Sequence, residues 1–168
     1  MKDYIFLIGA QGVGKTTIAR LLKDILISPH IDFDWIRDFH LNKEWGNYSD
    51  KEWEMSLENL TFILKNYKKH HFHNVITSGF TEKDIGELIE VFKEDNFVII
   101  TLYLTDDNEL KNRVLNESRD SGFRDYESSI KFNKKLRDEV NYLSEYKINN
   151  TYQTPEETVE KIVELLSE

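Results

Sequence analysis

The sequence contains no cysteine, which excludes disulfides, thiol chemistry and cysteine-based zinc sites. It has only two prolines, Pro29 and Pro155, and no linker rich in proline, glycine or serine divides its 168 residues. It also lacks any apolar run of about 18 residues, the length that a membrane span needs. We therefore expect one domain over residues 1–168, in a reducing compartment such as the cytoplasm and without a membrane partner.

Positive charge is scarce as well. Lysine and arginine total 22 against 31 acidic residues, which gives a net charge of −9. A protein that grips duplex nucleic acid needs a basic face to neutralise phosphates, so this balance argues against nucleic acid as the main partner. Hydrophobic residues at 39% and charged residues at 32% are typical of a folded globule.

Short apolar runs alternate with amphipathic segments along the whole chain. The runs predict five strands, at residues 4–8, 33–37, 75–78, 97–104 and 146–148. The segments between and after them predict six helices, the fifth of them over 126–143. This alternation predicts an α/β domain with a parallel sheet, whose ligands bind beyond the carboxyl ends of the strands.

A phosphate-binding motif stands between the first strand and the first helix. The motif G-x-x-x-x-G-K-[ST] is matched by Gly9 to Thr16, in the place where its mechanism requires it. Loop amides would point at the phosphates, Lys15 would lie between the β- and γ-phosphates, Thr16 would bind Mg²⁺ and Thr17 would contact the α-phosphate. The predicted nucleotide-binding residues are therefore Gly9, Ala10, Gln11, Gly12, Val13, Gly14, Lys15, Thr16 and Thr17.

The motif alone is compatible with an ATPase, a GTPase or a kinase. Reading guanine takes the motif N-K-x-D, and both Asn-Lys pairs of this chain, at Asn42 and Asn133, lack the aspartate. This argues against a GTPase. The whole chain resembles the small P-loop kinases, the group that contains adenylate, shikimate, gluconate and nucleoside kinases. The resemblance rests on the loop Gly9–Thr17, an acidic residue after the second strand, an arginine-rich stretch, and residues 148–157.

The resemblance implies a three-layer α/β/α fold with a five-stranded parallel sheet in the order 2-3-1-4-5 and a short lid that closes over ATP. It further implies transfer of the γ-phosphoryl group of Mg²⁺-ATP to a small acceptor, with nucleosides or nucleotides as the first acceptor class. The acceptor region would cover residues 38–70 and the lid residues 113–126. Two alternatives stay open: a polynucleotide 5′-hydroxyl kinase, and a regulatory nucleotide-binding module with weak ATPase activity. We expect a monomer or a homodimer.

Phosphoryl transfer also needs a carboxylate that orients or deprotonates the acceptor. Asp38 follows the predicted second strand and is the first candidate, while Asp34 takes its place if the strand is shifted by a few residues. Arg37 is a candidate for acceptor binding. In the lid, the predicted phosphate contacts are Arg113 on the nucleotide and Arg119 and Arg124 on the transferred phosphoryl group.

One position departs from the family pattern. Ser78 ends the third predicted strand, where a chain like adenylate kinase carries an aspartate. A serine cannot supply the negative charge that orders the water molecules around Mg²⁺. Either Asp38 or Asp34 takes over this task, or the protein binds nucleotide with weakened catalysis.

Overall fold

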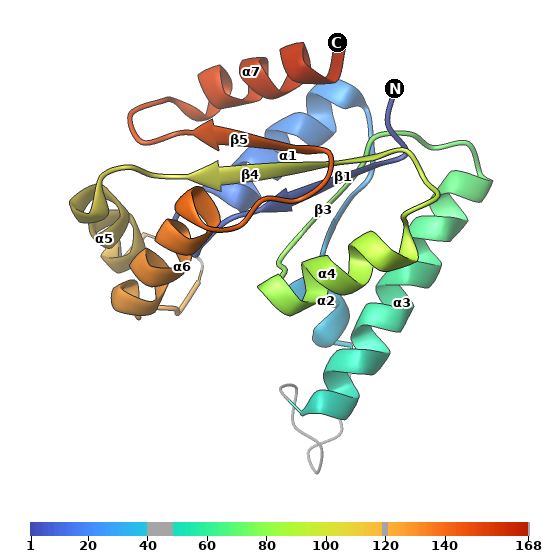
Figure 1. Ribbon diagram of the computed structural model, residues 1–168, viewed down its shortest axis with the longest axis horizontal. Helices are drawn as coiled ribbons and strands as arrows, with labels where there is room; N and C mark the ends of the chain where they lie inside the picture. Colours follow the sequence, from blue (N-terminus) through green and yellow to red (C-terminus); the bar gives the residue numbers. More distant parts are fainter. Residues whose placement is uncertain (40–48, 119–120, 168) are drawn as a thin grey trace.

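The computed structural model describes residues 1–39, 49–118 and 121–167, and its strands and helices alternate along the chain (Figure 1). In chain order they are β1 (Tyr4–Ile8), α1 (Lys15–Leu26), β2 (His30–Asp32), α2 (Phe33–Arg37), α3 (Asp50–Lys69), β3 (Val75–Ser78), α4 (Glu82–Val91), β4 (Phe97–Tyr103), α5 (Asp107–Leu115), α6 (Tyr126–Asp138), β5 (Glu145–Asn149) and α7 (Pro155–Ser167).

The five strands form one sheet in the order β2-β3-β1-β4-β5, and every neighbouring pair is parallel. This confirms the predicted strand order. Because all strands run the same way, their carboxyl ends meet at one edge of the sheet. The segments that follow Ile8, Asp32, Ser78, Tyr103 and Asn149 therefore lie along that edge.

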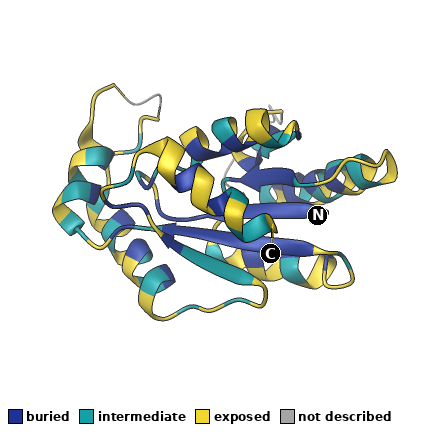
Figure 2. Ribbon diagram, turned by 90° about the horizontal axis from the view of Figure 1, so that it is seen from above, coloured by how far each residue is buried: buried dark blue, intermediate teal, exposed yellow. Residues whose placement is uncertain are grey.

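Helices cover both faces of the sheet, so the predicted three-layer architecture is confirmed (Figure 1). On one face, Leu7 and Ile100 pack with Leu22 of α1 and Ile162 of α7. On the other face, aromatic and aliphatic side chains of β1 and β4 pack against α3 and α4. Figure 2 shows buried strands and helices that are exposed on their outer surfaces. Among the helices of the described residues, none has the length and apolar character of a membrane span.

The prediction of a strand over 33–37 is wrong, because this segment is helix α2 and the strand before it ends at Asp32. Phe33 and Ile36 are buried and three residues apart, while Asp34 is exposed, which is helical rather than alternating spacing. The side chain of Asp32 accepts a hydrogen bond from the backbone N–H of Asp34 (3.1 Å) and so caps the helix. The correction moves the end of the second strand six residues upstream of Asp38.

The other predicted bounds differ from the structure mainly at α6. Its predicted end at residue 143 is wrong, because the helix stops at Asp138 and the N–H of Val140 bonds back to the carbonyl of Lys135 (3.1 Å). The helices α3, α4 and α7 begin at capping residues. The side chains of Ser49 and Thr154 accept hydrogen bonds from backbone N–H groups, and Thr81 forms a capping box.

Candidate functional site

The phosphate loop connects β1 to α1 at the carboxyl edge of the sheet. Gly14 stands at the N-cap of α1 with φ of 102°, a conformation that residues with a side chain rarely adopt. Thr16 and Thr17 follow on the first helical turn, and both are exposed. The first turn of an α-helix presents N–H groups without helical partners, which together with the helix dipole attract an anion.

The ammonium group of Lys15 lies over the loop. Its Nζ donates hydrogen bonds to the carbonyl oxygens of Gly9 (2.7 Å) and Ala10 (2.9 Å). The positive charge is therefore held at the mouth of the loop, next to the exposed hydroxyl groups of α1. This is the place where the sequence predicted the contact with the β- and γ-phosphates.

Two side chains that the sequence analysis did not identify hold the loop from outside. Ser129 of α6 donates a hydrogen bond to the carbonyl of Gln11, and the side-chain amide of Asn150 donates to the carbonyl of Val13 (2.6 Å). Both side chains are buried. Carbonyls tied in this way leave the neighbouring N–H groups of the loop for a ligand. The two anchors lie 118 and 137 residues away in the sequence, so no local pattern could have indicated them.

A slot of about 150 Å³ opens beside the loop. Arg113 lines it, and its guanidinium is fixed by the carbonyl of Thr151 (2.6 Å) and the carboxylate of Glu109 (2.7 Å). The Oδ1 atom of Asn150 is buried and has no hydrogen-bond partner within the described part of the chain. The slot thus offers the planar guanidinium cation of Arg113, the apolar ring of Pro155 and the buried hydrogen-bond acceptor of Asn150. Its other lining residues are Val13, Gly14, Thr17, Ile18, Gln153, Pro155 and Thr158.

A buried carboxylate, which the sequence analysis missed, lies at the ends of β2 and β3. Asp32 and Ser78 are partners in the register of the two strands, and Asp32 Oδ2 accepts a hydrogen bond from the Ser78 hydroxyl (3.2 Å). A Cβ atom at Gly79 would lie 2.6 Å from Asp32 Oδ1, so the absence of a side chain there makes room for the carboxylate. Asp32 therefore brings a negative charge to the strand end where Ser78 replaces the family's aspartate.

His30 extends this hydrogen-bonded chain along β2. Its Nε2 lies 3.2 Å from the Ser78 hydroxyl oxygen. Because a serine hydroxyl has one hydrogen, and this one goes to Asp32, His30 must be the donor to Ser78. Burial lowers the pKa of His30 and outweighs the opposite effect of the Asp32 charge. His30 is thus the neutral Nε2–H tautomer at neutral pH.

The two candidate acceptor carboxylates occupy different places on α2. Asp34 is in the first turn, forms an ion pair with Arg37 (3.2 Å) and keeps 66% of its side chain exposed. Burial of its inner surface and the charge of Asp32 raise the pKa of Asp34, while Arg37 and Lys15 oppose this. Asp34 therefore lies within electrostatic reach of the loop lysine. Asp38 is exposed at the C-cap, one turn further on.

The lid arginines have separate positions. Arg113 is a wall of the slot, as described above. Arg124 is exposed in the connection between α5 and α6, where it donates hydrogen bonds to the carbonyls of Ser121 (2.6 Å) and Phe123 (2.8 Å) rather than to the phosphate loop. Arg119 lies outside the described residues. The structure thus brings Thr17 and Arg113 together at the slot, with Lys15 and Thr16 directly before Thr17 on α1, whereas the hydrogen bonds of Arg124 stay within its own connection.

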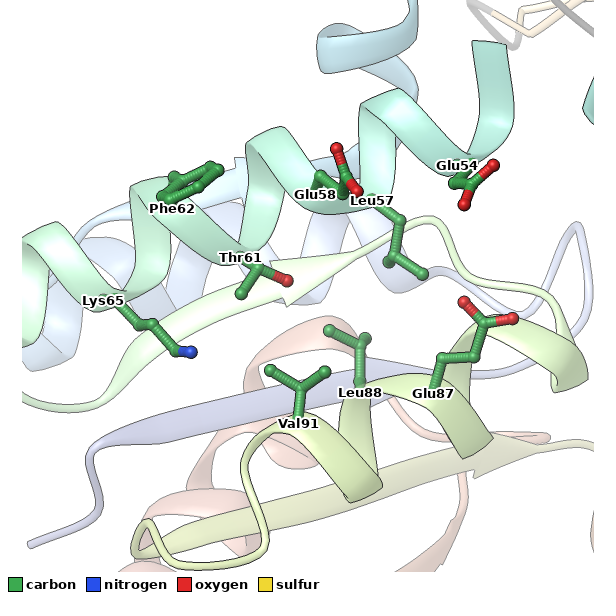
Figure 3. A pocket seen from close by; sticks show the side chains of 9 residues that line it. All are labelled: Glu54, Leu57, Glu58, Thr61, Phe62, Lys65, Glu87, Leu88 and Val91. Atoms are coloured by element: carbon green, nitrogen blue, oxygen red, sulfur yellow. The ribbon is translucent and has the colours of Figure 1, made fainter. Parts of the chain in front are cut away.

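A larger hollow of about 460 Å³ lies between α3 and α4, with Leu57 and Leu88 facing each other across it (Figure 3). Neither the phosphate loop, nor the slot, nor the pair of Asp32 and Ser78 contributes a residue to its lining. Its volume exceeds that of the slot, but it carries no group suited to phosphate chemistry apart from one lysine, Lys65. We therefore locate the candidate site at the loop and not at this hollow.

Comparisons with known proteins bear on the fold. No protein-family model and no curated protein matches the sequence. Solved structures do match: a sugar kinase from a Janibacter species has 17% identity and a TM-score of 0.70, and covers 99% of this chain and 95% of its own. A gluconokinase from Sinorhizobium meliloti has 16% identity and a TM-score of 0.68, with 98% and 91% covered. A shikimate kinase from Acinetobacter baumannii, in complex with shikimate, has 23% identity and a TM-score of 0.63, with 98% and 92% covered. The chain thus has the fold of the small P-loop kinases.

Proposed function

We propose that this protein is an ATP- and Mg²⁺-dependent phosphotransferase that moves the γ-phosphoryl group to a hydroxyl of a small acceptor. The observation that carries the proposal is one juxtaposition: a phosphate loop with its lysine and exposed threonines, the carboxylate of Asp32 at the end of β2, and the carboxylate of Asp34 in the helix that follows. Phosphoryl transfer needs neutralisation of the phosphate charge and a positioned acceptor. The phosphate loop with Lys15 can supply the first, and the neighbouring carboxylates can supply the second.

The triphosphate would bind at the loop amides and the first turn of α1. Lys15 would exchange its hydrogen bonds to the loop carbonyls for oxygens of the β- and γ-phosphates, and the exposed Thr17 hydroxyl would reach the α-phosphate. The base would enter the slot between Arg113 and Pro155, where a guanidinium plane can stack on it. The buried Oδ1 of Asn150 would accept a hydrogen bond from its amino group.

The residues at this edge fit Mg²⁺, which in such sites takes few protein ligands and keeps several water molecules. Thr16 offers an exposed hydroxyl as ligand. Asp32 offers a carboxylate that its contacts with Ser78 and the backbone of α2 hold in one orientation, and that would orient a metal-bound water. Among the described residues, no group of three or more histidine, aspartate or glutamate side chains could hold a metal ion. Binding of Mg²⁺ through few protein ligands and several water molecules does not need such a group. The ion would neutralise charge on the β- and γ-phosphates.

The acceptor hydroxyl would be oriented by Asp34, which is exposed and feels the charge of Lys15. The oxygen of the acceptor hydroxyl would form a bond to the γ-phosphorus. The bond between this phosphorus and the β,γ-bridging oxygen would break, and ADP would leave with the electron pair of that bond. The acceptor proton would pass to Asp34. Asp38 is the alternative carboxylate. Arg119 and Arg124 would contact the transferred group when the segment between α5 and α6 closes over it.

A coupled assay of ADP release tests the proposal. The acceptor panel contains nucleosides, nucleoside monophosphates, sugars, shikimate and 5′-hydroxyl oligonucleotides, and the variants are Lys15→Ala, Asp34→Asn and Asp38→Asn. At least one small acceptor should raise ADP formation, Lys15→Ala should abolish the increase, and Asp34→Asn should reduce kcat more than Asp38→Asn. A slow ADP release that no acceptor raises would instead support the regulatory module.

A further inference from the structure

Arg37 directly precedes the predicted acceptor region, residues 38–70. It is the only arginine between Arg20 and Arg113 in the sequence, so the acceptor region itself contains no guanidinium. Carboxylates and phosphates are bound best by guanidinium groups, because two parallel N–H donors match two oxygens. An anionic acceptor would therefore depend on this one side chain.

The structure shows that Arg37 is already engaged. Its side chain is only 11% exposed, its Nη1 lies 3.2 Å from Asp34 Oδ1, and its guanidinium carbon lies 4.4 Å from the centre of the Trp53 ring. The indole N–H of Trp53 is bonded to Asp84, a fully buried residue that also caps α4 through Thr81. The guanidinium is thus held between an ion pair and an anchored aromatic ring, and its low exposure limits the access of a ligand anion.

The exposed charged side chains of α2 and its C-cap are both negative. Asp34 and Asp38 are both exposed and stand four residues apart, so they face the same way from α2. The charges of Asp32 and Asp38 both act on the Asp34 carboxyl. Arg37 and Lys15, whose charges also act on Asp34, offset two of these three acids, and the remaining negative charge repels a carboxylate or phosphate that approaches Asp34.

We infer that the acceptor is a hydroxyl compound that carries no negative charge, and that Asp34 and Asp38 accept hydrogen bonds from its hydroxyl or ammonium groups. This inference rests on the proposed function, since it names the acceptor class of the same site. It favours neutral sugars, aminosugars or nucleosides, and it disfavours sugar acids, shikimate and nucleoside monophosphates. The protein would differ in this respect from a gluconokinase or a shikimate kinase of the same fold.

Pairs of acceptors whose members differ in charge test the inference. The pairs are glucose and gluconate, glucosamine and gluconate, and a nucleoside and its 5′-monophosphate. For each pair we would measure calorimetric binding in the presence of Mg²⁺ and a non-hydrolysable ATP analogue, and kcat/KM with ATP. The uncharged or cationic member of at least one pair should be favoured about tenfold or more in both measurements. A preference for the acidic members, or equal binding of both members of every pair, overturns the inference.

Substitutions test the inferred acceptor class separately from the proposed activity. Asp38→Asn should reduce the preference against the acidic member several-fold, whereas the matched change Asp24→Asn, on the exposed surface of α1, should leave it unchanged. An unchanged preference in Asp38→Asn would contradict the role of this carboxylate. If the charge preference persists in binding but no acceptor gives ADP that depends on Lys15, the proposed activity fails while the acceptor class stands. If acidic acceptors turn over well, the acceptor class fails while the activity stands.

Discussion

We predict that removing the negative charge at the end of β2 lowers activity, and that placing a negative charge at the end of β3 in the same protein restores it. Asp32 ends β2 and Ser78 ends β3, and their side-chain oxygens lie 3.2 Å apart. If the charge of Asp32 orders the metal-bound water, Asp32→Asn removes it while keeping the shape of the side chain and an oxygen that caps α2. The double change Asp32→Asn with Ser78→Asp returns a carboxylate to the position where chains like adenylate kinase carry it.

The sizes of these effects follow from the geometry. A hydrogen bond to a charged group is worth about 1.5–3 kcal/mol, so Asp32→Asn should lower kcat/KM by about 10- to 150-fold. The double variant should recover to within about tenfold of the original protein, because the charge returns only a few ångströms away. Ser78→Asp alone sets two carboxylates side by side. At about 4 Å their repulsion is about 4 kcal/mol, enough to protonate one of them near neutral pH.

The assay is steady-state ADP release at several Mg²⁺ concentrations, with thermal unfolding to verify that each variant folds. Asp32→Asn should raise the Mg²⁺ concentration needed for half-maximal activity, and the double variant should bring it back. Ser78→Ala should fall between the original protein and Asp32→Asn, because it removes one donor but no charge. Full activity in Asp32→Asn, or no recovery in the double variant, would refute the role that we give to Asp32.

Three further predictions concern other contacts. Gly79→Ala should destabilise the fold by about 1–3 kcal/mol, since φ is +92° and the new Cβ would lie 2.6 Å from Asp32 Oδ1; thermal unfolding measures this. Burial raises the pKa of Asp3, but hydrogen bonds from Lys68 and a backbone amide lower it overall, so Asp3→Asn should cost about 0.5–1 kcal/mol in urea unfolding at about pH 7, and this cost should shrink as the pH falls through the lowered pKa of the folded state. Arg113→Ala should weaken calorimetric ATP binding about tenfold and leave pyrophosphate binding unchanged.

Controls and contrary results are available for each of these. Gly86→Ala on α4 adds a Cβ that meets no atom within 4 Å, and it should stabilise the helix slightly rather than destabilise it. Equal unfolding temperatures for the two glycine variants would contradict the close packing against the carboxylate. A cost of Asp3→Asn that stays constant as the pH falls would contradict the ion pair. An equal loss of ATP and pyrophosphate binding in Arg113→Ala would contradict its place in a base-binding slot.

The phosphate loop was predictable from the sequence because it rests on a local pattern. A buried apolar strand, glycines at fixed spacing and an amphipathic helix specify the loop, and the full-length resemblance adds the sheet order. The second strand was misplaced for an equally local reason. Phe33 and Trp35 alternate with Asp34 as in a strand, and only the burial of Phe33 with Ile36 reveals a helix.

The acidic part of the site was harder to predict because it is assembled across strands. Asp32 acts through its contact with Ser78, 46 residues away, and no pattern in one sequence records the register of two parallel strands. The cap of α2 was the one available signal, since Asp32 and Asp34 are spaced as an N-cap and the second residue of a helix. Asn150 and Ser129 were also not predicted, because the loop carbonyls that they bind are far away from them in the sequence.

The most direct test of the central claim follows the phosphoryl group itself. The protein is incubated with Mg²⁺ and ATP that carries oxygen-18 in its γ-phosphoryl group, together with a neutral or cationic hydroxyl acceptor that raises ADP release, and the products are analysed by mass spectrometry. The account predicts a labelled phosphoryl group on the acceptor, in an amount equal to the ADP formed, and none with Lys15→Ala. Label that appears only in inorganic phosphate, or a labelled acceptor formed equally well by Lys15→Ala, would contradict it.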